Sequence, residues 1–126
     1  MTKTVSWHRL CRGRDFRVDD ATVEVTFHEG RRHRVTVEEV DEEYRLTALV
    51  ARRRDVADVR NLPMQTWLRN RGTALVGFRI DGRGAAVGEA WVPKVGLTAE
   101  EFQVYVRAVA TESDRFEYAL TGKDVE

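Results

Sequence analysis

His8 and Cys11, near the start of the sequence, are residue types that could support nucleophilic chemistry. Three positions apart, they would meet on a helix, and the neighbouring arginines would favour the thiolate, which is the nucleophilic form of cysteine. A small hydrolase with Cys11 as nucleophile and His8 as base is therefore one hypothesis. The sequence offers no oxyanion hole and no residue to orient the histidine, so we expect no catalytic residues.

The other two histidines, His28 and His33, flank an expected turn near Glu29 and could approach each other. A metal site would need a third protein ligand in a fixed geometry, and the spacing supplies none. Cys11 is the only cysteine, which excludes a disulfide framework or a cysteine-based metal cluster within one chain. We therefore expect no metal site and no cofactor.

Three glycines, Gly82, Gly84 and Gly88, invite comparison with the phosphate-binding loops of dinucleotide-binding proteins. The third glycine comes one residue late, and alternating strand residues follow it in place of a helix. Without the start of a helix there are no free N–H groups and no dipole to hold a pyrophosphate. The segment is predicted to be a hairpin turn.

Arginine outnumbers lysine 18 to 3, which fits either phosphate recognition or the codon preference of a GC-rich genome. Arg52, Arg53 and Arg54 end an expected strand, and together with Arg69 and Arg71 they could bind nucleic acid or an acidic protein. Few aromatic residues interleave with them, and the 21 basic residues are balanced by 21 acidic ones. Both facts count against a nucleic-acid binder, which stays the alternative hypothesis.

An apolar cluster, Leu62, Met64, Trp67 and Leu68, lies in an expected short helix. A short helix needs only one side for the core, and tryptophan is favoured at the centres of protein interfaces. Extra apolar surface on a small domain favours self-association. We expect a homodimer that binds another protein through its sheet, this helix or both, with the arginines named above at the rim to steer an acidic partner.

The composition is that of a folded chain: 126 residues, 42% hydrophobic and 33% charged. That length suits one domain, residues 1–126, whose core needs no disulfide. No apolar run approaches the roughly 20 residues that cross a bilayer. Met1–Trp7 lacks the basic and apolar regions of a signal peptide. We expect a cytoplasmic protein with no membrane partner.

Apolar and polar residues alternate in three segments, at 21–28, 33–40 and 44–51, as in half-buried strands. Because paired residues share a face of a sheet, the phases of these segments fix the parity of the turns. The first turn needs three or five residues around Gly30. The second needs an even number, and Val40–Glu43 supplies four. A three-stranded meander is predicted.

After the meander the sequence predicts a short helix, which Asn61 caps and which ends in a left-handed conformation at Gly72. A second hairpin then turns at Asp81–Gly84. Alternating apolar residues mark its two strands: Ala74, Val76, Phe78 and Ile80 on the first, and Ala85, Val87 and Trp91 on the return.

The last predicted element is a long helix that begins with a capping box at Thr98–Glu101 and is closed by Gly122. Its apolar residues form one stripe: Phe102, Val106, Val109, Ser113, Phe116 and Leu120. Together the elements predict an α+β fold, a five-stranded antiparallel sheet with the long C-terminal helix packed on one face.

Several motifs resemble the YbjN family. They are the run Trp67–Arg71, the segments Val76–Asp81 and Gly88–Pro93, and the start of the last helix at Gly96–Phe102. The similarity spans about Asp15 to Gly122. That family is similar in fold to the type III secretion chaperones, which have a curved antiparallel sheet flanked by helices and are usually homodimers.

The resemblance implies a chaperone-like protein-binding role or a regulatory role in sensory transduction, with no catalytic residues to carry over. One feature departs from it. The chaperones begin with a full amphipathic helix that contributes to their partner grooves, whereas only about Val5 to Cys11 precede Gly13 here. We expect a single short turn in its place, and effector binding in the secretion sense is not implied.

Overall fold

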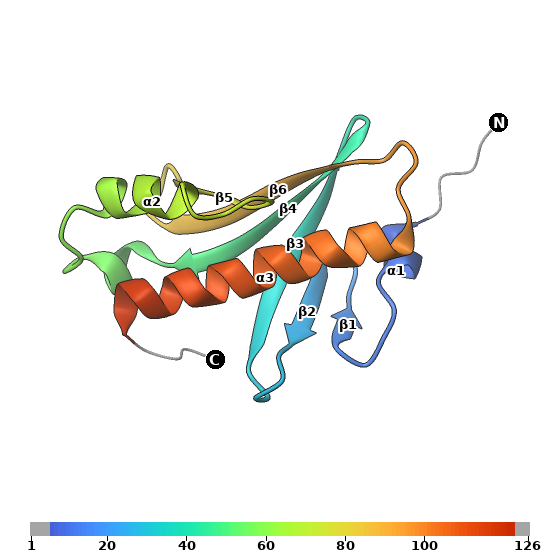
Figure 1. Ribbon diagram of the computed structural model, residues 1–126, viewed down its shortest axis with the longest axis horizontal. Helices are drawn as coiled ribbons and strands as arrows, with labels where there is room; N and C mark the ends of the chain where they lie inside the picture. The colour runs from blue at the N-terminus through green and yellow to red at the C-terminus, as the bar shows by residue number, and fades with distance from the viewer. Residues whose placement is uncertain (1–5, 123–126) are drawn as a thin grey trace.

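One antiparallel sheet of six strands, crossed on one face by a long helix, forms the frame of the computed structural model, which describes residues 6–122 (Figure 1). Expectations for residues 1–5 and 123–126, including most of Met1–Trp7, lie outside the described residues. The elements in chain order are α1 (Trp7–Leu10), β1 (Phe16–Val18), β2 (Thr22–Thr26), β3 (Arg32–Val40), β4 (Glu43–Ala51), the 3-10 helix η1 (Arg53–Val56), α2 (Leu62–Asn70), β5 (Gly77–Ile80), β6 (Ala86–Pro93) and α3 (Ala99–Thr121).

The order of strands across the sheet is β1-β2-β3-β4-β6-β5. The predicted meander is β2, β3 and β4, and its register sets Val37 opposite Leu46, as the apolar phases require. The second hairpin joins the meander through β6, which pairs with β4. The predicted α+β class, antiparallel sheet and C-terminal helix are confirmed.

The sheet has one strand more than predicted, because β1 adds to its edge with Phe16 opposite Val25. Three residues are too few to show an alternating pattern in the sequence. What holds β1 in place is long-range packing: Phe16 is buried, and the Arg107 guanidinium of α3 lies 4.5 Å from the centre of its ring.

The two turns of the meander obey the predicted parity, whereas the β3–β4 and β5–β6 turns differ in length from the prediction. The β2–β3 loop has the five residues 27–31, an odd number, since Thr26 pairs with Arg32. The β3–β4 loop is Asp41-Glu42, even as required but shorter than the four residues expected. The β5–β6 loop is 81–85, one residue longer than expected.

Beyond the turn, the residues of β6 that were predicted as its apolar face, Val87 and Trp91, lie on the side of the sheet that points away from the core. Ala86, Ala90 and Val92 are buried, whereas Trp91 is exposed and Val87 half-buried. The reason is the close approach of α3: a Cβ atom at Gly88 would lie 2.3 Å from Oγ of Ser113. Around Gly88 the helix therefore leaves room only for small residues on this face, and Val87 and Trp91 point away from it.

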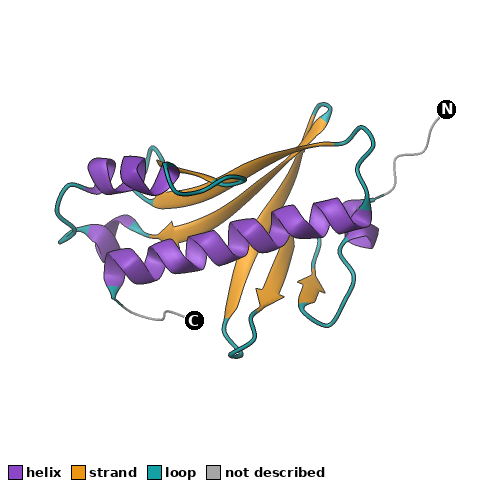
Figure 2. Ribbon diagram, viewed as in Figure 1, coloured by secondary structure: helices purple, strands orange, loops and turns teal. Residues whose placement is uncertain are grey.

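The predicted stripe on α3 is confirmed from Phe102 to Phe116, and this part of the stripe packs against the sheet. Leu120 is only half-buried. The capping box forms as predicted, since Thr98 Oγ1 accepts from the Glu101 N–H at 3.1 Å. Gly122 closes the helix in the left-handed conformation. Figure 2 shows the strands fanning out behind α3, from steep at β1–β3 to nearly parallel with it at β6, as expected for a strongly twisted sheet.

Helix α2 is found where it was expected, with two corrections at its ends. Asn61 occupies the N-cap position, but it has a left-handed backbone and its side chain makes no capping hydrogen bond. Gly72 lacks the predicted positive φ, because the helix ends in a tight right-handed turn in which the Gly72 N–H donates to the Arg69 carbonyl. Neither end therefore uses the cap that the sequence predicted.

Candidate protein-binding surface

The apolar residues of α2 divide between two sides of the helix. Leu62 is half-buried against the core and Thr66 is buried, with its hydroxyl donating to the Leu62 carbonyl at 2.8 Å. Three residues face outward and form what we call the helix surface: Met64, Trp67 and Leu68, which are 48%, 56% and 51% exposed. A helix of nine residues with three large apolar side chains about half exposed is unusual for an isolated domain.

The two arginines of the α2 region have different surroundings. The Arg71 guanidinium lies 5.3 Å from the centre of the Trp67 ring, at the margin of the helix surface. Arg69 points the other way, toward α3, and lies 5.3 Å from the centre of the Phe116 ring. A cation over an exposed aromatic face contributes roughly 0.5–1 kcal/mol. Arg71 therefore helps to hold Trp67 in its outward position, and Arg69 helps to dock α2 on α3.

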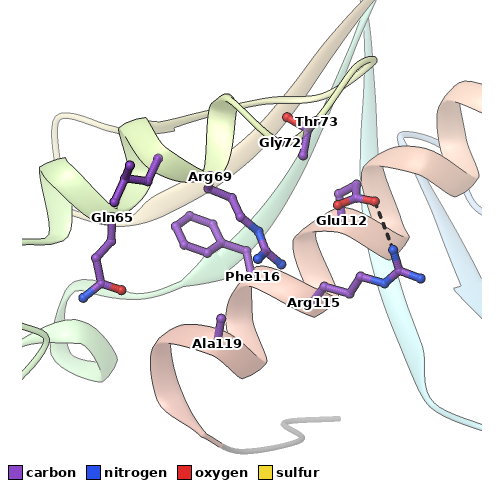
Figure 3. A pocket seen from close by; sticks show the side chains of 9 residues that line it. Gln65, Arg69, Gly72, Thr73, Glu112, Arg115, Phe116 and Ala119 are labelled. Atoms are coloured by element: carbon purple, nitrogen blue, oxygen red, sulfur yellow. Dashed lines mark hydrogen bonds and ion pairs between the residues drawn. The ribbon is translucent and has the colours of Figure 1, made fainter.

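An open concavity of about 440 Å³ separates α2 from α3 (Figure 3). Arg69 and Phe116 meet in it, and the ion pair of Glu112 with Arg115, at 3.3 Å, lies along the α3 side. Leu68 adds one edge of the helix surface to its lining. The lining combines an aromatic ring with a paired acid and base, a surface that suits packing of a protein segment.

A second apolar area lies near the edge of the sheet; we call it the sheet surface. It consists of Leu75 and Trp91, which are 42% and 44% exposed. Leu75 and Trp91 line a groove of about 320 Å³ over Gly77, whose missing side chain leaves the space open. The Arg45 guanidinium, itself paired with Glu38, lies 5.7 Å from the Trp91 ring centre.

Arg52, Arg53 and Arg54 lie at the end of β4 and the start of η1, and all three are exposed. They line a concavity of about 670 Å³ together with Arg83 and Leu49. Arg69 lines the separate concavity between α2 and α3. The predicted arginines are thus divided: Arg52–Arg54 line one concavity, Arg69 lines another, and Arg71 lies beside Trp67.

The hydrolase hypothesis fails on the surroundings of its two residues. Cys11 is buried, and desolvation raises the pKa of its thiol to about 12, so the nucleophilic thiolate is suppressed at neutral pH. Both ring nitrogens of His8 have other partners: Nε2 lies 2.8 Å from the Asp20 carbonyl oxygen, and Nδ1 lies 2.6 Å from Oγ of Ser6. A base so engaged does not activate a buried thiol.

His33 belongs to a charged cluster that the sequence did not reveal, together with Asp114 and Glu117 on α3. Ligand atoms of these three residues lie within 4.8 Å of one another. However, Arg31 donates to Oδ2 of Asp114 at 2.7 Å, and His33 Nε2 donates to the Leu49 carbonyl at 2.8 Å. Since Arg31 already supplies a positive charge, the cluster serves to tie α3 to β3. No spacing signal could have found it, because 81 positions separate His33 from Asp114.

No protein-family model and no curated protein matches this sequence. Among solved structures, the fold is similar to that of chains in type III secretion complexes. A chain of the ExsC–ExsE complex has a TM-score of 0.58 at 18% identity, covering 82% of this chain and 80% of that one. A chain of the ExoU–SpcU complex from Pseudomonas aeruginosa has a TM-score of 0.55 at 15% identity, covering 83% and 87%.

The type III secretion chaperone SycH of Yersinia pestis, solved with a fragment of YscM2, has a TM-score of 0.51 at 6% identity, covering 86% of this chain and 97% of that one. At these identities the likeness shows the fold alone. It supports the chaperone-like fold that the sequence resemblance implied. The expected departure from that fold is also present, since α1 has four residues. Within residues 6–122, no helix is long and apolar enough to cross a membrane.

Proposed function

We propose that this protein is a non-enzymatic, chaperone-like or regulatory protein-binding domain, residues 1–126, that acts as a homodimer in the cytoplasm and is related to the YbjN family. The observation that carries the proposal is the helix surface, where Met64, Trp67 and Leu68 are about half exposed. The likeness to chains that were solved in complexes with other proteins supports it.

The helix surface is assigned to the homodimer. Burial of apolar area stabilises association by roughly 25 cal/mol per Å² before the costs of association are subtracted. Trp67 offers the largest such area on α2, and a tryptophan at the centre of an interface is often a hot spot. Arg71 lies over its ring at the margin, where a cation can steer an acidic partner.

The sheet surface, Leu75 and Trp91, is assigned to the other protein. It lies over β5 and β6, whereas the helix surface lies on α2. An enzymatic role has little support, because the buried thiol of Cys11 stays neutral and His8 is engaged elsewhere.

The test is sedimentation of Trp67→Ala over a range of concentrations, with Trp91→Ala as the matched control. Both changes remove an exposed tryptophan, one from the helix surface and one from the sheet surface. We expect Trp67→Ala to weaken self-association and Trp91→Ala to leave it intact. A wild-type chain that stays monomeric, or equal weakening by both changes, would contradict the assignment of the dimer to α2.

A further inference from the structure

The concavity beside the end of β4 combines apolar side chains with positive charge. Its lining includes the apolar residues Leu49, Ala57 and Ala85 and four arginines: Arg52, Arg53, Arg54 and Arg83. We call it the arginine concavity. Its volume is about 670 Å³, enough for a few residues of a peptide.

The charge of this concavity is uncompensated. Within residues 6–122, none of its four arginines forms an ion pair, whereas six other arginines do: Arg31, Arg32, Arg45, Arg79, Arg107 and Arg115. Asp81 is the one acidic residue in the lining. Its Oδ1 accepts from the N–H groups of Arg83 and Ala85 at 2.9 and 3.0 Å, so that oxygen is committed to the turn. Four cations therefore face a single, partly engaged carboxylate.

One of the four arginines, Arg53, is held in place by packing. A Cβ atom at Gly84 would lie 3.1 Å from both Cγ and Cδ of Arg53, so the arginine stem rests on the β5–β6 turn. Gly84 also has a φ of +82°, a conformation that favours glycine. The turn thus contacts the Arg53 stem and itself contains Arg83, which brings cations from two distant segments to one opening.

We propose that the arginine concavity binds an extended acidic segment of a partner protein, with carboxylates on the arginines and an apolar side chain over Leu49. Guanidinium groups bind carboxylates in a forked geometry, and such charge-assisted hydrogen bonds are stronger than neutral ones. The inference rests on the proposed protein-binding function and specifies the chemistry of the partner.

A nucleic acid fits this concavity less well. Single strands are held by aromatic side chains on which bases stack, and no aromatic residue lines the arginine concavity. Its apolar lining residues match an aliphatic side chain, which a nucleic acid lacks. Leu49 together with four arginines in one lining is the pattern expected for an acidic peptide with hydrophobic residues.

The test is fluorescence anisotropy with a labelled oligopeptide of alternating glutamate and leucine, at about 50 mM and 200 mM salt. The variant is Arg52→Glu/Arg54→Glu, and the control is Arg12→Glu/Arg14→Glu, which makes the same charge change at two exposed arginines before β1. We expect the first variant to weaken binding by about tenfold or more and the control to change it by about twofold at most. Binding of the wild type should weaken at the higher salt.

Several results would overturn the inference: no binding of the glutamate–leucine peptide to the wild type, equal losses in the two variants, or equal binding of a lysine–leucine peptide. Tighter binding of an oligothymidylate that Arg52→Glu/Arg54→Glu abolishes would assign the concavity to nucleic acid. Sedimentation of the same proteins separates this inference from the proposed dimer. Trp67→Ala should lose self-association and still bind the peptide, so either proposal can fail while the other stands.

Discussion

The side-chain amide of Asn70 exchanges two hydrogen bonds with the backbone of Phe78. Its Nδ2 donates to the Phe78 carbonyl at 2.9 Å, and its Oδ1 accepts from the Phe78 N–H at 2.6 Å. Phe78 lies on β5, the edge strand of the sheet, so the amide takes the place of a peptide group of a neighbouring strand. This contact blunts the edge against pairing with other chains and fixes α2, with its exposed Trp67, beside the sheet.

Asn70→Asp should destabilise the fold by roughly 1–3 kcal/mol, because the carboxylate keeps the acceptor but leaves the part-buried Phe78 carbonyl without its donor. The measurement is the free energy of unfolding from urea denaturation. Asn61→Asp is the matched control, since Asn61 is exposed and its side chain makes no hydrogen bond among the described residues. Equal destabilisation by both changes would refute the role given to Asn70.

Gly88→Ala should destabilise the protein by about 1–3 kcal/mol, the typical range for overpacking of a core. The added Cβ would lie 2.3 Å from Oγ of Ser113 and 3.0 Å from Cε1 of Phe78. Ser113 is fully buried, and its hydroxyl has no hydrogen-bond partner among the described residues. Ser113→Ala alone should therefore be neutral or stabilising, because it removes an unsatisfied polar atom.

The double variant Gly88→Ala/Ser113→Ala provides the decisive comparison. Without the serine oxygen, the closest contact of the new methyl group is the 3.0 Å approach to Phe78. The double variant should thus recover much of the stability that Gly88→Ala loses, a non-additivity that urea denaturation of all four proteins measures. Strictly additive effects would mean that Ser113 is not the obstacle.

Features that depend on neighbouring residues could be predicted from the sequence. The capping box at Thr98 and the parity of the β2–β3 and β3–β4 turns follow from local spacing, and both are present. The short helix with an outward Trp67 was also expected, because nine residues leave only one side for the core.

Features that depend on distant residues could not be predicted. The phase of β6 is decided by the approach of α3 at Gly88, and β1 is too short to carry an alternating pattern. The contact of Asn70 with Phe78 and the ion pair of Arg31 with Asp114 join residues that the fold, and not the spacing, brings together. The same holds for the arginine concavity, where Arg83 joins Arg52–Arg54 only through the β5–β6 turn.

Cys11 should resist alkylation by iodoacetamide in the folded protein. Burial raises the pKa of its thiol to about 12, from a usual value of 9.0, so the reactive thiolate is scarce at mildly alkaline pH. In urea the thiol is exposed and should react at the rate of a free cysteine, which mass spectrometry can follow. Equally fast labelling of the folded chain would contradict the burial of Cys11 and reopen the question of a reactive thiol.

Asp81→Asn should lower the thermal stability at neutral pH, and this loss of stability should disappear in acid. The N–H groups of Ala85 and Arg83 donate to the Asp81 carboxylate and hold its pKa below the usual 3.8, with Arg79 and Arg83 adding to the effect. Because the folded state favours the ionised form, this stabilisation is present above pH 3.8 and is lost as the pH falls through the lowered pKa.

The melting temperatures of wild type and Asp81→Asn should therefore differ at neutral pH and converge below pH 3.8. Asp58→Asn is the control, because Asp58 is exposed and forms no hydrogen bond or ion pair within residues 6–122; its difference from the wild type should stay small at every pH. A gap for Asp81→Asn that persists undiminished in acid would mean that the charge of the carboxylate does not hold the β5–β6 turn, and that Arg83 is positioned by other contacts.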